Sequence, residues 1–117
     1  MPAFNSMFPV LPGKEEAARA WIAQLAGPRK DGFDALQERS GIARETLTLQ
    51  KTPAGAFLLF WFDGDVEKAF AAVITGDDEF TVWHREQLRE ITGIDLAGGG
   101  EGGAPPEMLL DWPAAAA

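Results

Sequence analysis

The sequence contains no cysteine and only one histidine, and these two shortages exclude whole classes of chemistry. Without cysteine the chain can form no disulfide, no thiolate metal site and no cysteine nucleophile. A single histidine cannot build a multi-histidine metal centre, and we expect neither a metal nor a cofactor. Serine occurs only at Ser6 and Ser40, and neither lies in the Gly-x-Ser-x-Gly context of a nucleophile elbow, which argues against a hydrolase.

Positive charge is also scarce, because 10 lysines and arginines face 18 acidic residues and the formal net charge is -8. A negative protein repels phosphate, so we expect neither nucleic acid nor a membrane as a partner. No apolar run approaches the roughly 20 residues of a membrane-spanning helix. Residues 1–6 also lack the basic and apolar regions of a signal peptide. Together with the lack of cysteine, these features predict a cytoplasmic protein.

The most apolar stretch, Ala56–Phe62, reads Ala-Phe-Leu-Leu-Phe-Trp-Phe and lies between two turn-forming segments. This pattern predicts a strand. Phe57, Leu59 and Trp61 would line one face of the sheet, and the residues between them the other. In a strand with one solvent-exposed face, apolar and polar residues alternate, and in Ala56–Phe62 they do not. We therefore expect both faces to be covered, one by helices of the same chain and the other by a second copy.

Periodicity predicts further elements around this strand. A first strand over residues 4–10 precedes a helix that ends at Gly27-Pro28, and residues 29–40 favour a short amphipathic continuation. Strict alternation predicts a half-exposed edge strand over Glu45–Lys51, with Leu47 and Leu49 pointing inward. A second helical stretch follows the apolar strand, and Gly76 splits it in two.

The C-terminal part of the sequence changes character. Residues 97–106 are rich in glycine and proline and predict a loop. Glu107–Trp112 contains three consecutive apolar residues and predicts a short final strand. Residues 113–117 predict a frayed tail. We expect residues 1–117 to form a single domain.

The predicted order β-α-β-β-α-β is that of the ferredoxin-like α+β fold. It implies a four-stranded antiparallel sheet with helices on one face and the Ala56–Phe62 strand in a central position. The opposite face of such a sheet is open. We therefore expect a homodimer that forms through this sheet face.

Two motifs carry a resemblance to a known superfamily. Leu11–Glu16, followed by a helix with Trp21, resembles the start of dimeric α+β barrel proteins. Trp83–Leu88, followed by Thr92–Leu96, resembles an uncharacterised bacterial family with this topology. The resemblance implies two ferredoxin-like protomers packed sheet against sheet. Members of the superfamily include cofactor-free monooxygenases, haem-degrading enzymes, isomerases and proteins of no known activity, and none of those enzymes' site patterns is intact here.

His84 is the only side chain whose ordinary pKa suits proton transfer near neutral pH. On a helix it shares a stripe with Phe80, Trp83 and Gln87, so it points toward the interior. One interpretation is a structural histidine that is hydrogen-bonded to a backbone carbonyl. Another is a catalytic acid–base or ligand-contacting residue, and a haem ligand is a third.

The tryptophans suggest where a ligand would bind. They are either core residues or the lining of a site for a flat apolar molecule. The candidate ligand-binding residues are Trp21, Trp61, Trp83 and Gln87. Two function hypotheses remain: a dimeric module that binds a small apolar molecule, or a cofactor-free monooxygenase- or isomerase-like enzyme that acts on a small apolar or aromatic compound. We favour the first, because the chain lacks a paired acid–base set.

Overall fold

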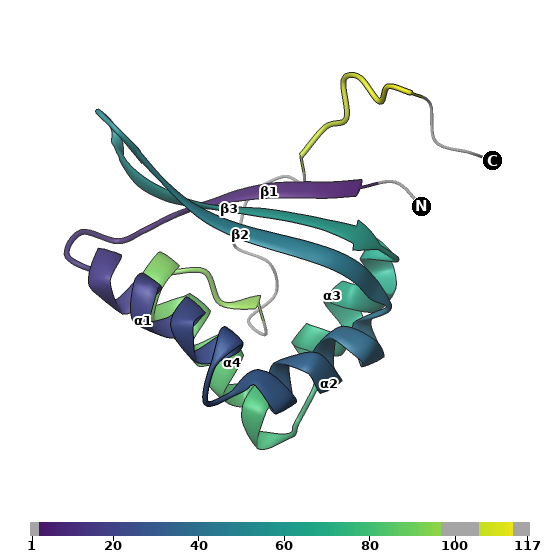
Figure 1. Ribbon diagram of the computed structural model, residues 1–117. Coiled ribbons are helices and arrows are strands. Elements are labelled where there is room, and N and C mark those ends of the chain that lie inside the picture. The colour runs from purple at the N-terminus through teal and green to yellow at the C-terminus, as the bar shows by residue number, and fades with distance from the viewer. Residues whose placement is uncertain (1–2, 97–105, 114–117) are drawn as a thin grey trace.

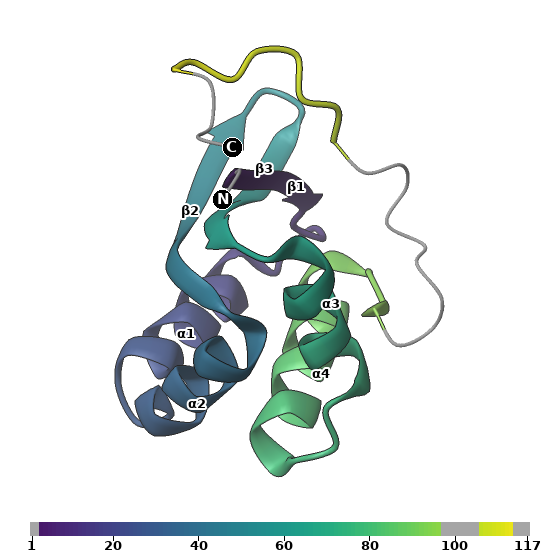
Figure 2. The same cartoon turned by 90° about the vertical axis from the view of Figure 1, so that its right-hand side faces the viewer.

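The computed structural model describes residues 3–96 and 106–113, so most of the predicted loop (97–106) and tail (113–117) lies outside the described residues. The described residues form an α+β protein with a three-stranded antiparallel sheet and four helices (Figure 1). The elements are β1 (Ala3–Pro9), α1 (Glu15–Ala26), α2 (Lys30–Ser40), β2 (Ile42–Thr52), β3 (Gly55–Gly64), α3 (Val66–Thr75) and α4 (Glu79–Thr92). All four helices lie on one side of the sheet, α1 beside α2 and α3 beside α4 (Figure 2).

The predicted ferredoxin-like β-α-β-β-α-β fold with a four-stranded sheet is wrong. The described residues follow the order β-α-α-β-β-α-α, and the strands lie in the order β1-β3-β2. The expected fourth strand, Glu107–Trp112, pairs with no described strand, and Leu109 and Trp112 are 86% and 84% exposed. This segment lies beyond the sheet on the side away from the helices (Figure 1). A short apolar run favours extended backbone, but it becomes a strand only where a sheet edge pairs with it.

The ends of the helices follow local signals in the sequence. α1 ends before Gly27-Pro28, where the proline removes a backbone donor and a new helix, α2, begins. Gly41 and Gly93 close α2 and α4 with positive φ angles of 69° and 79°, which glycine adopts without strain. Asp78 caps α4 by accepting a hydrogen bond from the backbone N–H of Thr81 at 3.1 Å. The predicted division of the helices at Gly27-Pro28 is confirmed.

β3 lies between the other two strands, which confirms the predicted central position of the apolar stretch. Leu58 and Phe62 point toward the helices and are buried. Phe57, Leu59 and Trp61 point to the opposite face of the sheet, which we call the outer face, and are only partly buried within one chain. The helices therefore cover one face of the sheet, while the outer face has no covering layer among the described residues.

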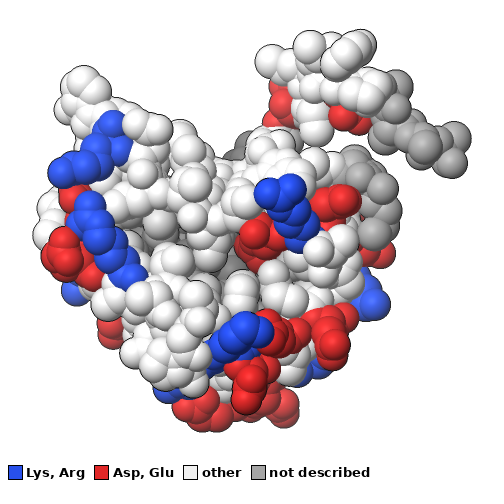
Figure 3. Space-filling model, viewed as in Figure 1, with Lys and Arg blue, Asp and Glu red and all other residues white. Residues whose placement is uncertain are grey.

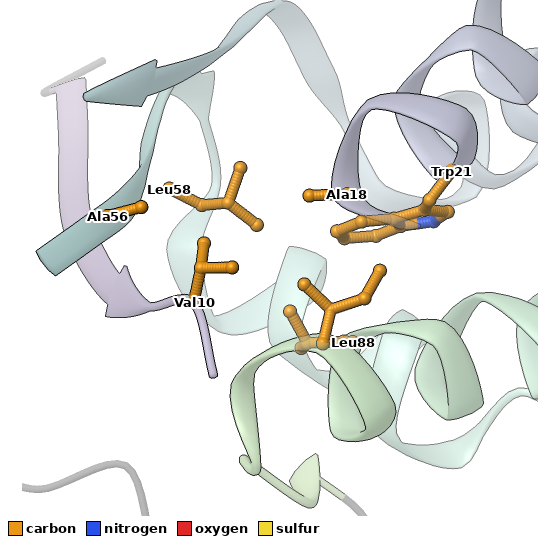
Figure 4. Packing of buried hydrophobic residues seen from close by; sticks show 7 residues of the cluster. Val10, Ala18, Trp21, Ala56, Leu58 and Leu88 are labelled. Carbon is orange, nitrogen blue, oxygen red and sulfur yellow. The ribbon is translucent and has the colours of Figure 1, made fainter. Parts of the chain in front are cut away.

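The main hydrophobic core lies between the sheet, α1 and α4 (Figure 4). Its buried members are Val10, Ala18, Trp21, Ala56, Leu58, Leu88 and Ile91. Trp21 and Ile91 are only 2% and 1% exposed. Burial of each large apolar side chain stabilises the fold by about 2 kcal/mol. This core holds α1 against α4 and so fixes the helix that carries His84.

The surface carries the acidic surplus mainly over the helices, and uncharged side chains cover much of the sheet in the same view (Figure 3). No helix within residues 3–96 and 106–113 has the length and apolar character needed to cross a bilayer.

Candidate functional site

A cavity of about 100 Å³ lies between the sheet and the helices. Each of the three strands and four helices contributes to its wall, so only the folded chain can form it. Five phenylalanine side chains line it: Phe4, Phe8, Phe60, Phe62 and Phe70. Their rings contact one another in pairs, with centroids 4.9 Å apart for Phe8 and Phe60 and 5.1 Å apart for Phe4 and Phe62. Such rings form a largely apolar wall that suits a flat molecule.

Glu45 brings a carboxyl group into this apolar wall. β2 has an irregular register between Ile42 and Arg44, and beyond it Glu45 lies opposite Phe62 on the helix face of the sheet. The amide Nε2 of Gln37, on α2, donates a hydrogen bond of 2.7 Å to Oε1 of Glu45. Bulges of this kind often re-aim a side chain next to a functional site. Here the irregularity directly precedes Glu45, the one acidic side chain that the described residues place in the cavity wall.

The environment of Glu45 disfavours its charged form. Burial raises the pKa of the Glu45 carboxyl above its ordinary value, and the hydrogen bond from Gln37 offsets part of this rise. No lysine or arginine of the described residues forms an ion pair with Glu45. Arg85, the only cationic residue among the described residues of the cavity wall, donates instead to the carbonyl oxygens of Val73 and Gly76 at 2.9 and 2.6 Å. Glu45 is therefore a carboxyl group that takes up a proton more readily than an ordinary glutamate does.

His84 also lines the cavity, from α4. Its Nδ1 accepts a hydrogen bond of 3.2 Å from the indole Nε1–H of Trp21. Because Nδ1 is the acceptor, the proton of the neutral imidazole is on Nε2. The ring stacks on Phe80 with centroids 5.5 Å apart. Burial lowers the pKa of His84 to about 4, so the imidazole is neutral at physiological pH.

The structure brings together two of the five site residues that the sequence suggested. Trp21 and His84 both line the cavity and are hydrogen-bonded to each other. Trp61 lies on the outer face of the sheet, opposite Asn5 of β1. Trp83 packs on Phe80 and stacks under the guanidinium of Arg29, 4.1 Å from the ring centroid. Trp83 and Gln87, which is partly buried on α4, are not among the residues that line this cavity.

Sequence reasoning missed the polar residues that the strands contribute. Glu45 has the same strand parity as Leu47 and Leu49, which were expected to point inward. Ser6 has the same parity as its neighbours Phe4 and Phe8 and lines the cavity with them. In both cases the sequence carried a signal: a polar residue at a position that the alternation of an apolar strand points inward.

A second hollow of about 210 Å³ lies between α1 and β2. Its lining is apolar except for Arg19 and Thr48, and Arg19 already pairs with Glu16 at 2.6 Å. The described residues that line this hollow include no acid and no histidine. We therefore place the candidate site in the smaller cavity, where titratable groups and aromatic rings converge.

Comparisons with protein-family models, with curated proteins and with solved structures found no match to this chain. Within residues 3–96 and 106–113, no group of three or more histidine, aspartate or glutamate side chains is placed to hold a metal ion. The chemistry of the site therefore has to be inferred from its own geometry.

Proposed function

We propose that the protein binds a small, mostly apolar molecule, about the size of one six-membered ring, in the cavity between the sheet and the helices. The observation that carries this proposal is the convergence of five phenylalanine side chains on a space that protein atoms leave unfilled. Dry apolar cavities of roughly 150 Å³ bind benzene-sized molecules. A cavity of about 100 Å³ selects a single small ring or a compact chain.

Three polar groups orient the ligand in this proposal. The Ser6 hydroxyl and Nε2 of His84 have no hydrogen-bond partner among the described residues. Glu45 uses Oε1 to accept from Gln37, and its other oxygen has no such partner. A few polar groups in an apolar wall are what fixes the orientation of a bound small molecule. The preferred ligand therefore carries at least one oxygen or nitrogen atom on its ring.

We propose further that two copies assemble through the outer face of the sheet. Phe57, Leu59 and Trp61 form an apolar centre there, and Met7 of β1 is 59% exposed beside Leu59. Thr48 of β2 lies on the other side of Leu59 and begins a polar rim. An apolar centre with a polar rim is typical of protein interfaces. The lack of cysteine supports a cytoplasmic location.

The binding proposal is tested by filling the cavity. Ala69 on α3 is buried and lines the cavity, whereas Ala71 on the same helix is exposed. NMR titration of the labelled protein with phenol and with cyclohexanone measures the affinity. We expect Ala69→Leu to weaken binding at least about tenfold, because the added carbons occupy the space, while Ala71→Leu leaves it unchanged. Equal binding by a folded Ala69→Leu variant would overturn the proposal.

A second candidate function is a cofactor-free isomerase- or oxygenase-like enzyme that acts on the same class of compound. The observation that favours it is Glu45, a carboxyl group with a raised pKa that faces a cavity. Such groups are frequent at catalytic sites, although structural environments produce them too. Turnover of a bound compound, and its loss in a Glu45 variant, separates this candidate from simple binding.

A further inference from the structure

We infer that Glu45 and His84 form a proton-transfer centre for a small carbonyl compound. Glu45 acts as the base that removes a proton from the carbon next to the carbonyl group, and the Nε2–H of His84 donates a hydrogen bond to the carbonyl oxygen. This inference rests on the proposed function, because the compound must first occupy the cavity. Its substrate class is a β,γ-unsaturated ring ketone, a neutral compound whose C–H bond next to the carbonyl group is acidic.

The first argument is the position of Glu45. Its Oε1 is held by Gln37 at 2.7 Å, which fixes the carboxyl group at the cavity wall. Every fully buried side-chain oxygen of the described residues has a hydrogen-bond partner. Oε2 of Glu45 has no such partner, so this oxygen is not fully buried and faces accessible space. A base needs one such free oxygen within reach of the proton that it removes. Burial also raises the pKa of Glu45 toward the range where a carboxylate is an effective base at neutral pH.

The second argument is the protonation state of His84. Trp21 donates to Nδ1, so the imidazole presents Nε2 as a hydrogen-bond donor. Every fully buried side-chain nitrogen of the described residues has a hydrogen-bond partner. Nε2 of His84 has none, so it also reaches accessible space. With a pKa of about 4 the ring stays neutral. A neutral imidazole that donates to a carbonyl oxygen is an established electrophile in proton-transfer sites.

The reaction balances with these two groups alone. The carboxylate of Glu45 takes the proton, the C–H electron pair forms the carbon–carbon double bond of an enolate, and the carbonyl oxygen becomes negative. The Nε2–H of His84 stabilises this oxygen by a hydrogen bond and keeps its own proton. Glu45 then returns the proton to a different carbon of the conjugated system. The double bond has moved, the carboxylate is restored, and no oxidant or reductant has been consumed.

The surroundings of the cavity define what else can titrate there. Within residues 3–96 and 106–113, the only titratable or charged residue of the wall besides Glu45 and His84 is Arg85, whose guanidinium donates to backbone carbonyls. The residues that α1, α2, α3, β1 and β3 contribute carry no titratable group. The rate should therefore rise with pH through the pKa of Glu45 as its carboxylate forms, and no other group of the wall should produce this limb.

The test uses a β,γ-unsaturated cyclohexenone, whose isomerisation to the conjugated ketone is followed by ultraviolet absorbance. We expect the protein to accelerate it and Glu45→Gln to reduce the rate at least about 100-fold while binding, followed by NMR, is retained. Glu38→Gln, an exposed substitution on α2, is the matched control and should leave the rate unchanged. His84→Gln should lower the rate with little change in binding.

A second variant keeps the inference falsifiable if Glu45→Gln does not fold. Gln37→Leu removes the hydrogen bond that lowers the pKa of Glu45, so the pH–rate limb should move to higher pH. A purely structural role of Gln37 would not move this limb. If the ketone binds but isomerises no faster than in buffer, the inference is overturned while the proposed function stands. If it neither binds nor isomerises, both are overturned.

Discussion

The indole Nε1–H of Trp21 on α1 donates a hydrogen bond of 3.2 Å to Nδ1 of His84 on α4, 63 positions further along the chain. The two ring centroids are 5.2 Å apart. This contact joins the two helices that enclose the main core, and it also sets the tautomer of the only histidine. A residue of the packed core thus determines the chemical character of a group at the cavity.

The first prediction concerns the pH dependence of stability. The pKa of His84 is about 4 in the folded chain and near 6.5 in the unfolded chain, so the unfolded state binds more protons between these values. The stabilisation is complete above pH 6.5 and is lost as the pH falls toward 4. This loss in the free energy of unfolding amounts to about 3 kcal/mol. Denaturant unfolding of the wild type and of His84→Gln at several pH values measures it, and parallel loss of stability in both proteins would contradict the prediction.

The second prediction concerns Trp21 itself. Trp21→Phe removes the donor to His84 and leaves a void in the core, so we expect a loss of about 2 kcal/mol in the free energy of unfolding. Trp112→Phe is the matched control, because Trp112 is 84% exposed and should contribute almost nothing. Urea unfolding followed by circular dichroism compares the two. Equal stabilities of both variants would show that Trp21 is not part of the core.

The third prediction concerns the outer face of the sheet. We expect a dimer at micromolar concentration, and we expect Leu59→Lys to dissociate it, because a charge at the centre of the apolar face cannot be buried without a partner. Ala20→Lys, an exposed substitution on α1, should remain dimeric. Sedimentation velocity distinguishes these outcomes. A wild type that stays monomeric over the whole concentration range would rule out this assembly.

The fourth prediction concerns the C-terminal segment. In the described residues Glu107–Trp112 belongs to no strand and its side chains are exposed, so its amide hydrogens should exchange at nearly unprotected rates. Amides in β3, which is paired on both sides, should be strongly protected. Hydrogen exchange followed by mass spectrometry measures both segments in one experiment. Protection of residues 107–112 comparable to that of β3 would show that the segment pairs with a strand.

Part of the site was available from the sequence and part was not. The alternation of β2 placed Leu47 and Leu49 inward, and Glu45 shares their parity, so an inward carboxyl group could be predicted. The stripe of α4 likewise placed His84 toward the interior, as the structure has it. What periodicity cannot give is the partner across the interior, because the contact of Trp21 with His84 depends on how two helices pack.

The sequence by itself determined the local elements: the central apolar strand, the edge strand beside it, and the ends of the helices at Gly27-Pro28, Gly41 and Gly93. Backbone preferences and side-chain periodicity act over a few residues, and they are written directly in the chain. Only the tertiary structure decided that Glu107–Trp112 adds no strand to the sheet and that Glu45 and His84 face one cavity. Strand pairing and cavity formation depend on contacts between distant segments, whose free energies no local pattern records.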